Sequence, residues 1–193
     1  MNKRLAFLID TRYCNNCKTC EIACKMERKL PMGQRWREVR RLELNEPSGP
    51  NNPYTVYNIP MSCNHCEEPA CAQVCPQNVY RKMPEGPVVM TSGLCIGCTK
   101  CISACPYSAP VYNPDIFMTG KCDMCYDRIK AGMQPYCVQC CPNNALKVDT
   151  YENLVAAYGA NQDLGIETTL VPSGSDTNPS IVIVTMKNQN MLP

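Results

Sequence analysis

The chain has 193 residues, of which 17 are cysteines, and a formal net charge of +2. Without cysteine, the hydrophobic fraction falls from 45% to roughly 36%, which is small for one aliphatic core in a chain of this length. The near-neutral charge argues against nucleic acid as a ligand, as do aromatic residues that do not interleave with Lys or Arg. The odd number and close spacing of the cysteines argue against a disulfide framework.

The N-terminal segment and the apolar runs predict neither an export signal nor a membrane span. Lys3 and Arg4 precede an apolar run at 5–9, which is too short for a signal peptide and has no small-residue cleavage site. The longest apolar run, 181–186, is far below the about eighteen residues that a spanning helix needs. We therefore expect any membrane attachment to come through a partner.

The cysteines fall into four groups that repeat a common spacing. The first group reads CxxCxxCxxxC, the second has a longer middle gap, and the third repeats the bacterial ferredoxin spacing. In the fourth group, an excursion of eleven residues separates the second and third cysteines. The groups are Cys14, Cys17, Cys20 and Cys24; Cys63, Cys66, Cys71 and Cys75; Cys95, Cys98, Cys101 and Cys105; and Cys122, Cys125, Cys137 and Cys141.

This spacing predicts cubane iron–sulfur clusters. Three thiolates on a tight loop reach three corners of one cluster, and a fourth cysteine on a short helical turn ligates the neighbouring cluster. Proline follows the last cysteine of three groups and suits the break there, because it fixes φ and has no N–H to donate. Structural zinc is the alternative, but three thiols plus a distant Cys-Pro, recurring along the chain, is not the usual zinc pattern.

Short strands are predicted before and after the first cysteine group. The apolar run 5–9 suits a strand, and residues that alternate between polar and apolar from Val39 predict another within the insertion 25–53. The insertion contains the only tryptophan, Trp36, and three prolines at 47–53 indicate a loop. The Arg and Lys residues of the insertion either dock an acidic partner or form a solvated face.

The connector between the second and third groups predicts how the four groups pair. Residues 79–83, 84–86 and 87–90 have the pattern of strand, turn and strand, so a hairpin brings these two groups together. The first and fourth groups are then left for each other. Their flanks agree with this, because 5–9 and 145–148 are short apolar segments suited to pairing as strands. The pairing is therefore predicted to be nested.

From the nested arrangement we assign sixteen iron ligands in four sets, and expect four [4Fe-4S] clusters. Each set combines three cysteines of one group with the last cysteine of its paired group. The inner sets are Cys63, Cys66, Cys71 and Cys105, and Cys95, Cys98, Cys101 and Cys75. The outer sets are Cys14, Cys17, Cys20 and Cys141, and Cys122, Cys125, Cys137 and Cys24.

Several residues near the predicted ligands have two interpretations. Cys140 competes with Cys141 for the place of fourth ligand, but only Cys141 precedes proline, so we interpret Cys140 as an unligated buried thiol. His65 either donates to a cluster sulfur or packs beside the cluster. Lys18 and Lys100 either favour the reduced cluster through their charge or are ordinary surface lysines.

Beyond residue 150 the cysteines stop. Residues 151–158 predict a short helix closed by Gly159, and 166–171 and 181–186 are apolar segments, the second a predicted strand. We expect this tail to pack on the cluster-binding body or on another subunit.

Together these patterns predict an α+β fold of duplicated bacterial dicluster ferredoxin-like modules with short β-hairpins and cluster-binding loops, plus an insertion and an extended C-terminal tail. The predicted divisions are an outer module at 1–24 and 114–150, an inner module at 54–113, the insertion at 25–53 and the tail at 151–193.

Four stretches of sequence carry a family resemblance. They are CNNCKTCEIAC (14–24), SCNHCEEPACAQVCP (62–76), CIGCTKCISACPYSAPVYN (95–113) and KCDMCYDRIKAGMQPYCVQCCP (121–142). Over residues 3–150 the chain resembles the iron–sulfur (beta) subunit of the dimethyl sulfoxide reductase family of molybdopterin oxidoreductases. The fourth stretch is the most specific, because simple two-cluster ferredoxins lack it.

The resemblance implies a four-cluster electron relay that binds a large catalytic subunit with a molybdenum or tungsten bis-pterin cofactor. It also implies a membrane quinol-binding subunit or a soluble electron donor as a second partner. The expected location is the cytoplasm, or export together with a signal-bearing partner. The chain shows no base, nucleophile or open metal position, so we expect no substrate chemistry of its own.

Two other functions are compatible with the cysteine pattern. One is a free-standing soluble polyferredoxin, and the other is an electron-transfer subunit of a hydrogenase or hydrogenlyase complex. The Trp36 insertion and the cysteine-free tail favour a dedicated subunit over a shuttle, because a shuttle needs little beyond its cluster-binding module.

Overall fold

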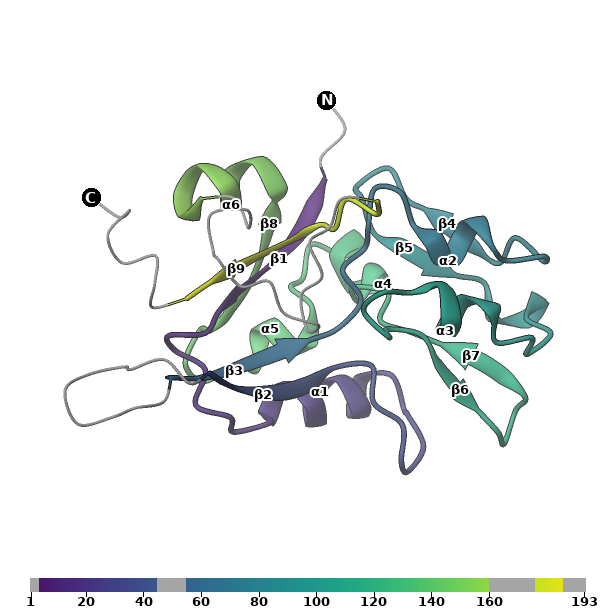
Figure 1. Cartoon of the computed structure of the whole chain (residues 1–193), viewed down its shortest axis with the longest axis horizontal. Coiled ribbons are helices and arrows are strands. Elements are labelled where there is room, and N and C mark those ends of the chain that lie inside the picture. Colours follow the sequence, from purple (N-terminus) through teal and green to yellow (C-terminus); the bar gives the residue numbers. More distant parts are fainter. Residues whose placement is uncertain (1–3, 45–54, 160–175, 186–193) are drawn as a thin grey trace.

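The computed structural model of the chain describes residues 4–44, 55–159 and 176–185 (Figure 1). The helices are α1 (Thr19–Glu27), α2 (Ala70–Gln73), α3 (Lys100–Ala104), α4 (Tyr126–Lys130), α5 (Tyr136–Gln139) and α6 (Tyr151–Tyr158), with a 3-10 turn η1 at Ser92–Leu94. The strands are β1 (Leu5–Asp10), β2 (Glu38–Leu44), β3 (Thr55–Met61), β4 (Tyr80–Lys82), β5 (Val88–Met90), β6 (Val111–Asn113), β7 (Met118–Gly120), β8 (Leu146–Thr150) and β9 (Ile181–Val184). This mixture of short helices and short hairpins agrees with the predicted α+β class.

A three-stranded sheet with the order β8-β1-β9 joins the two ends of the described chain. β1 pairs antiparallel with β8, from Leu5 opposite Thr150 to Ile9 opposite Leu146. The predicted pairing of the flanks of the first and fourth cysteine groups is therefore confirmed. β9 adds parallel to the other edge of β1, so the described end of the C-terminal tail packs on the body of this chain.

The apolar run of β1 is continuous because both faces of the central sheet are covered. Phe7 and Ile9 pack in the main core, together with several of the cysteines. Ala6 and Leu8 face the other way and pack with Leu154 of α6. Figure 1 shows α6 beside the sheet of β8, β1 and β9. Successive side chains of a strand point to opposite faces, so a strand buried on both sides has no polar positions to alternate with.

The helix predicted at 151–158 is confirmed as α6. The hydroxyl of Thr150 accepts a hydrogen bond from the backbone N–H of Asn153 and caps its first turn, as threonine does at many helix starts. Gly159 follows at a φ of 82°, a left-handed conformation that ends the helix at little steric cost.

The sequence predicts one of two short hairpins and does not predict the other. The predicted hairpin between the second and third groups is confirmed as β4–β5, with Tyr80 opposite Met90. The β6–β7 hairpin was not predicted: its strands are as short as those of β4–β5, but its connector at 114–117 has no Pro-x-Gly turn like that at 84–86. It crosses the division expected between residues 113 and 114, so its two strands would fall in different predicted modules.

The insertion is attached to the body through β2 and β3. The strand predicted from Val39 is confirmed as β2, which pairs antiparallel with β3 along its whole length. Trp36 lies against β7, where a Cβ on Gly120 would be 2.7 Å from the indole ring. The predicted loop at 47–53 and the apolar segment 166–171 lie outside the described residues. Within the described ranges, no helix is both long enough and apolar enough to cross a bilayer.

Candidate cluster-binding site

Four cavities, each lined by four cysteines, contain sixteen of the 17 cysteines. Their volumes, including their open mouths, are about 320, 290, 360 and 290 Å³, so all four could hold groups of one size. Cavity I is lined by Cys14, Cys17, Cys20 and Cys141; cavity II by Cys24, Cys122, Cys125 and Cys137; cavity III by Cys63, Cys66, Cys71 and Cys105; and cavity IV by Cys75, Cys95, Cys98 and Cys101. The structure thus brings together each of the four predicted sets of cysteines, and Cys140 lines none of these cavities.

The four loops share one backbone feature that places the sulfur atoms. In each group, the residue before the second cysteine has a positive φ, which turns the loop tightly. These residues are Asn16, His65, Gly97 and Met124. In two groups the turned N–H points at the first sulfur: His65 donates to Cys63 Sγ at 3.5 Å, and Met124 donates to Cys122 Sγ at 3.4 Å. Hydrogen bonds to sulfur of this kind tune cluster potentials.

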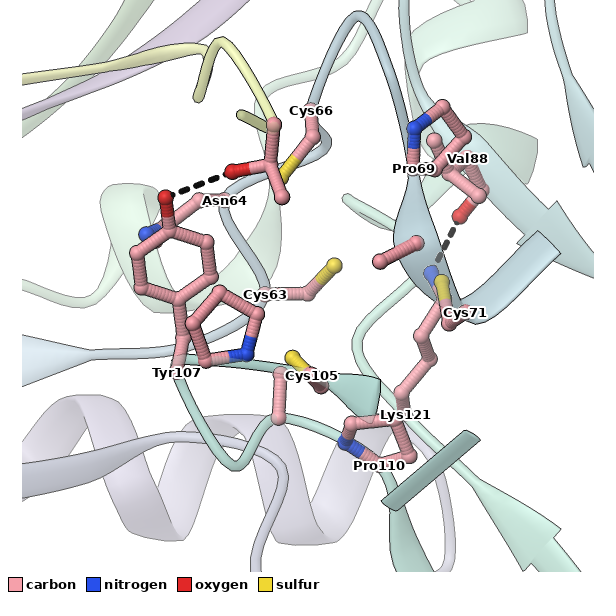
Figure 2. A pocket seen from close by; sticks show the side chains of 14 residues that line it. Cys63, Asn64, Cys66, Pro69, Cys71, Val88, Cys105, Tyr107, Pro110 and Lys121 are labelled. Carbon is pink, nitrogen blue, oxygen red and sulfur yellow. Dashed lines mark hydrogen bonds between the residues drawn. The ribbon is translucent and has the colours of Figure 1, made fainter. Parts of the chain in front are cut away.

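Cavity III shows how distant segments build one site. Figure 2 shows its four cysteines around a common space, with Lys121 and Tyr107 among the residues that line it. Lys121 donates from Nζ to the carbonyl oxygen of Val88 at 2.5 Å. The Tyr107 hydroxyl is 2.8 Å from the hydroxyl of Thr177, which belongs to the C-terminal segment. The tail therefore contributes directly to the wall of this cavity.

The cavities differ in how far their cysteines are shielded from solvent. All four cysteines of cavity II are buried, as are all but Cys105 in cavity III. Cavities I and IV each have one solvent-exposed cysteine, Cys17 and Cys98, and the other 15 are buried or partly buried. Two cavities are therefore central and shielded, and two are open to the surface.

Close cysteines of neighbouring cavities define a row. Cys20 of cavity I, Cys137 and Cys122 of cavity II, and Cys63 of cavity III pack in one buried cluster, in which Cys20 lies near Cys137 and Cys122 near Cys63. Tyr80 lies between cavities III and IV, because it interacts with a cysteine of each. The order in space is therefore I, II, III and IV.

Burial makes the shielded thiols poor thiolates. It raises the pKa of Cys20 and of Cys24 to about 12, and the pKa of Cys66 to about 11. A bound metal deprotonates a coordinating thiol outright, because its positive charge replaces the lost hydration. These all-sulfur, buried donor sets therefore fit a positively charged inorganic core.

The spacing of the donors favours a cluster over a single ion. No group of three or more His, Cys, Asp or Glu residues in the described ranges is arranged to hold one metal ion. Structural zinc needs four donors about 2.3 Å from a common centre, which brings them close together. Cysteines that share a cavity but lie farther apart suit a cubane, whose irons are at separate corners.

Two buried cations near the cavities were not found from the sequence. Arg37 is 2% exposed and lines cavity II, although the insertion was expected to dock a partner or face solvent. Lys121 is also 2% exposed, and besides Val88 it bonds the carbonyl oxygen of Cys122 at 3.0 Å. The two lysines considered from the sequence, Lys18 and Lys100, are exposed, with Lys18 on the rim of cavity I. The only early signal for Lys121 is its position directly before a predicted ligand.

His65 connects the second cysteine group to β5. Its ring is fully buried, and Nδ1 accepts the backbone N–H of Val88 at 3.0 Å. Burial and the nearby charges of Lys121, Lys82 and Arg37 hold the pKa of His65 well below its usual value, so the ring is neutral. This contact tethers the loop, while Nε2 is buried without a partner among the described residues, so donation from His65 to a cluster sulfur stays a prediction.

Comparison with known proteins identifies the family. The 4Fe-4S dicluster domain family matches residues 54–151 and residues 13–79. One chain of the anaerobic dimethyl sulfoxide reductase of Escherichia coli (strain K12) is 38% identical over 187 residues, covering 95% of this chain and 89% of that protein. The protein belongs to the 4Fe-4S dicluster domain family. The resemblance indicated by the four cysteine groups is thus confirmed.

More distant relatives extend the family to other anaerobic reductases. A subunit of the tetrathionate reductase of Salmonella typhimurium is 34% identical over 74% of this chain and 56% of that protein. Thiosulfate reductase electron transfer subunit PhsB of Salmonella typhi is 34% identical over 76% of each chain. The two matched dicluster segments overlap at 54–79. Neither segment contains both the first and the fourth cysteine group, whereas cavities I and II each combine cysteines of these two groups.

Proposed function

We propose that this protein binds four [4Fe-4S] clusters, one in each cavity, and relays single electrons along them. The four cysteines that line each cavity are the ligands of its cluster. The observation that carries this proposal is a row of four similar cavities, each with a complete set of four cysteines, in which only the end cavities have an exposed cysteine.

The exposure pattern suits conduction between two partners. A cluster surrounded by protein exchanges electrons with its neighbours while water and oxidants are kept away, and exposure is one of the factors that sets its potential. Electrons enter and leave at the exposed ends, beside Cys17 of cavity I and Cys98 of cavity IV, and pass through the shielded cavities II and III.

One partner in this proposal is a large catalytic subunit that carries a molybdenum or tungsten bis-pterin cofactor. The support is family membership, since the relatives are named as chains or subunits of reductases. The second partner is a membrane quinol-binding subunit or a soluble electron donor. This chain supplies the connection between them and no substrate chemistry.

The two ends of the row present different surfaces to such partners. Around Cys98, the side chains of Leu94, Ile96 and Phe117 are 55%, 62% and 71% exposed. Around Cys17, the rim has one exposed aromatic side chain, Tyr13, beside the polar Asn15 and Lys18. Exposed apolar groups beside a redox centre are typical of a surface that a partner covers, so we assign the Cys98 end to a permanent subunit contact.

Purification of the complex without oxygen tests the proposal. We expect about sixteen iron and sixteen acid-labile sulfide per chain, four one-electron steps in a redox titration, and a large subunit containing molybdenum or tungsten. A folded chain with zinc and no sulfide would overturn the clusters. Nickel in the large subunit would indicate a hydrogenase-type complex, and absence of any stoichiometric partner would indicate a shuttle.

A further inference from the structure

Cavity II has a wall unlike those of the other cavities, because two guanidinium groups and an indole line it. These belong to Arg28, Trp36 and Arg37. Arg28 is engaged by carboxylates: its Nε is 3.2 Å from Asp123 Oδ1, and it also pairs with Asp127. The charge of Arg28 is therefore already balanced by the protein.

Arg37 has no such balance in the described part of the chain. Its Nη1 donates to the carbonyl oxygen of Pro60 at 2.5 Å, and its guanidinium lies 4.6 Å from the centre of the Phe7 ring. Its Nε and Nη2 are buried and have no hydrogen-bond partner among the described residues. An unpaired buried charge of this kind is costly unless something in the site satisfies it.

Trp36 also has a buried N–H donor without a partner in the described ranges, and this donor is neutral. Its side chain lines the same cavity, and its Nε1 is buried and finds no acceptor among the described residues. Three N–H donors of two adjacent residues thus lack a protein acceptor, and all belong to side chains in the wall of cavity II. The charge of Arg37 also acts on Cys122, Cys137 and Cys24 of cavity II and on Cys20 of cavity I.

We propose that Arg37 and Trp36 are the residues that set the potential of the cluster in cavity II: Arg37 donates from Nε and Nη2, and Trp36 from Nε1, to its sulfur atoms. This inference rests on the proposed function. Four thiolates around a [4Fe-4S] core leave a net negative charge, which grows by one when the cluster is reduced. A fixed cation with hydrogen bonds to the sulfurs stabilises the reduced form more, so it raises the reduction potential.

The step requires an electron alone. Reduction of the cluster adds one electron to the iron–sulfur core, and no proton is transferred, because arginine stays protonated in proteins. The same charge acts on one cysteine of cavity I against three of cavity II, so the cluster in cavity I gains a smaller increase. In the relay, an electron is therefore more stable on the cluster of the shielded cavity II than on the cluster at either exposed end.

The test is a redox titration of the full chain in its complex, followed by EPR spectroscopy, for wild type and the Arg37→Met variant. Cys125→Ser, which changes one ligand of cavity II, identifies the titration step that belongs to its cluster. We expect Arg37→Met to lower the equilibrium constant for reduction of that cluster at least tenfold, a fall of about 59 mV for one electron. We expect the reduction potential of the cavity I cluster to fall less, and the reduction potentials of the clusters in cavities III and IV to be unchanged.

Arg35→Met is the matched control, because it removes the same charge two residues away. The Arg35 side chain is 53% exposed and lies 3.8 Å from Glu21 and 3.7 Å from Glu38, so solvent and these carboxylates screen it. We expect its four steps to match wild type. Equal shifts in Arg35→Met and Arg37→Met would overturn the proposal, because the effect would then be one of overall charge.

Two milder variants keep the proposal falsifiable if Arg37→Met assembles fewer clusters. Trp36→Phe removes one donor and no charge, and Arg37→Lys keeps the charge but has no planar pair of donors. We expect each to lower the cavity II step by less than Arg37→Met would. If both leave that step at its wild-type potential, the proposal is wrong.

The outcome is separable from that of the proposed function. Wild type with four clusters and unchanged potentials in every Arg37 and Trp36 variant would overturn this inference and leave the relay intact. Wild type without iron and sulfide would overturn both.

Discussion

The two central cavities and the two end cavities have the same ligands but different surroundings. Cavities II and III have buried cysteines and a buried cation, Arg37 or Lys121, in their walls. Cavities I and IV each have an exposed cysteine, and the lysine at the rim of cavity I is exposed. In the proposed relay, the shared set of four cysteines would determine what each cavity binds, and the surroundings would distinguish clusters that hold electrons from clusters that exchange them with partners.

The largest difference between the central and the end cavities is expected in the stability of variants that lose a cysteine ligand. Cys122→Ala removes a buried side chain of the main core and one ligand of cavity II, so we expect it to destabilise the fold by about 3 kcal/mol or more. Cys98→Ala removes an exposed ligand of cavity IV, and we expect loss of one cluster with a cost below about 1 kcal/mol from lost burial of the side chain.

Iron content per chain and chemical unfolding of the anaerobic protein measure the two ligand variants. If Cys98→Ala unfolded as readily as Cys122→Ala, the distinction between central and end cavities would be wrong for stability.

A smaller effect is expected from the glycine beside cavity IV. Gly97 has a φ of 67°, and a Cβ there would be 2.3 Å from the carbonyl oxygen of Phe117. We expect Gly97→Ala to cost about 2–3 kcal/mol and to weaken the cluster at the exposed end. Gly132→Ala is the control, since its φ of 74° is similar but no atom lies within 4 Å, so only about 1 kcal/mol of backbone strain applies.

Thermal unfolding of the Gly97 and Gly132 variants, with iron content, checks this difference. Equal costs for the two would show that the contact with Phe117 does not shape the cavity IV loop.

The lysines provide a further test of the difference in surroundings. Lys121→Met removes a buried cation from the wall of cavity III, and we expect the reduction potential of that cluster to fall. Lys18→Met removes an exposed cation at the rim of cavity I, where water and salt screen it, so we expect a much smaller fall. Redox titration at low and high salt measures both, and a larger fall for Lys18→Met would reverse the assignment of cations to the central cavities.

The smallest expected effect concerns the cysteine outside the four cavities. Cys140 is partly buried and lines none of them, so Cys140→Ser is expected to keep the wild-type iron content and all four redox steps. Loss of iron in this variant would mean that Cys140, rather than Cys141, completes the set of cavity I.

The sequence predicts those features that depend on local spacing and on connector length. The four cysteine groups, the β4–β5 hairpin and the pairing of β1 with β8 follow from short-range patterns and from the nesting that they impose. The same reasoning leads to four sets of cysteines that the structure brings together. These features are predictable because each depends on residues close in sequence or on one topological choice.

Other features depend on tertiary packing, which has no local signature. Arg37 lies in an insertion rich in arginine, and nothing in that pattern distinguishes the buried guanidinium from the exposed Arg35 and Arg41. The β6–β7 hairpin has no glycine in its connector to indicate a turn, and its position is fixed by contacts with Trp36 and the Gly97 loop. The positive φ of His65 is likewise set by its place in the loop. From the sequence, His65 was interpreted only through the chemistry of its ring.

The central position of β1 constrains how the protein is made. Among the described strands β1 is synthesised first, but both of its neighbours, β8 and β9, lie far downstream, and cavities I and II are incomplete until the cysteines of the fourth group are made. Cavities III and IV have all their cysteines between residues 63 and 105. We expect cofactor loading to begin at the second and third cysteine groups, and β1 to remain exposed to chaperones until β8 and β9 have been synthesised.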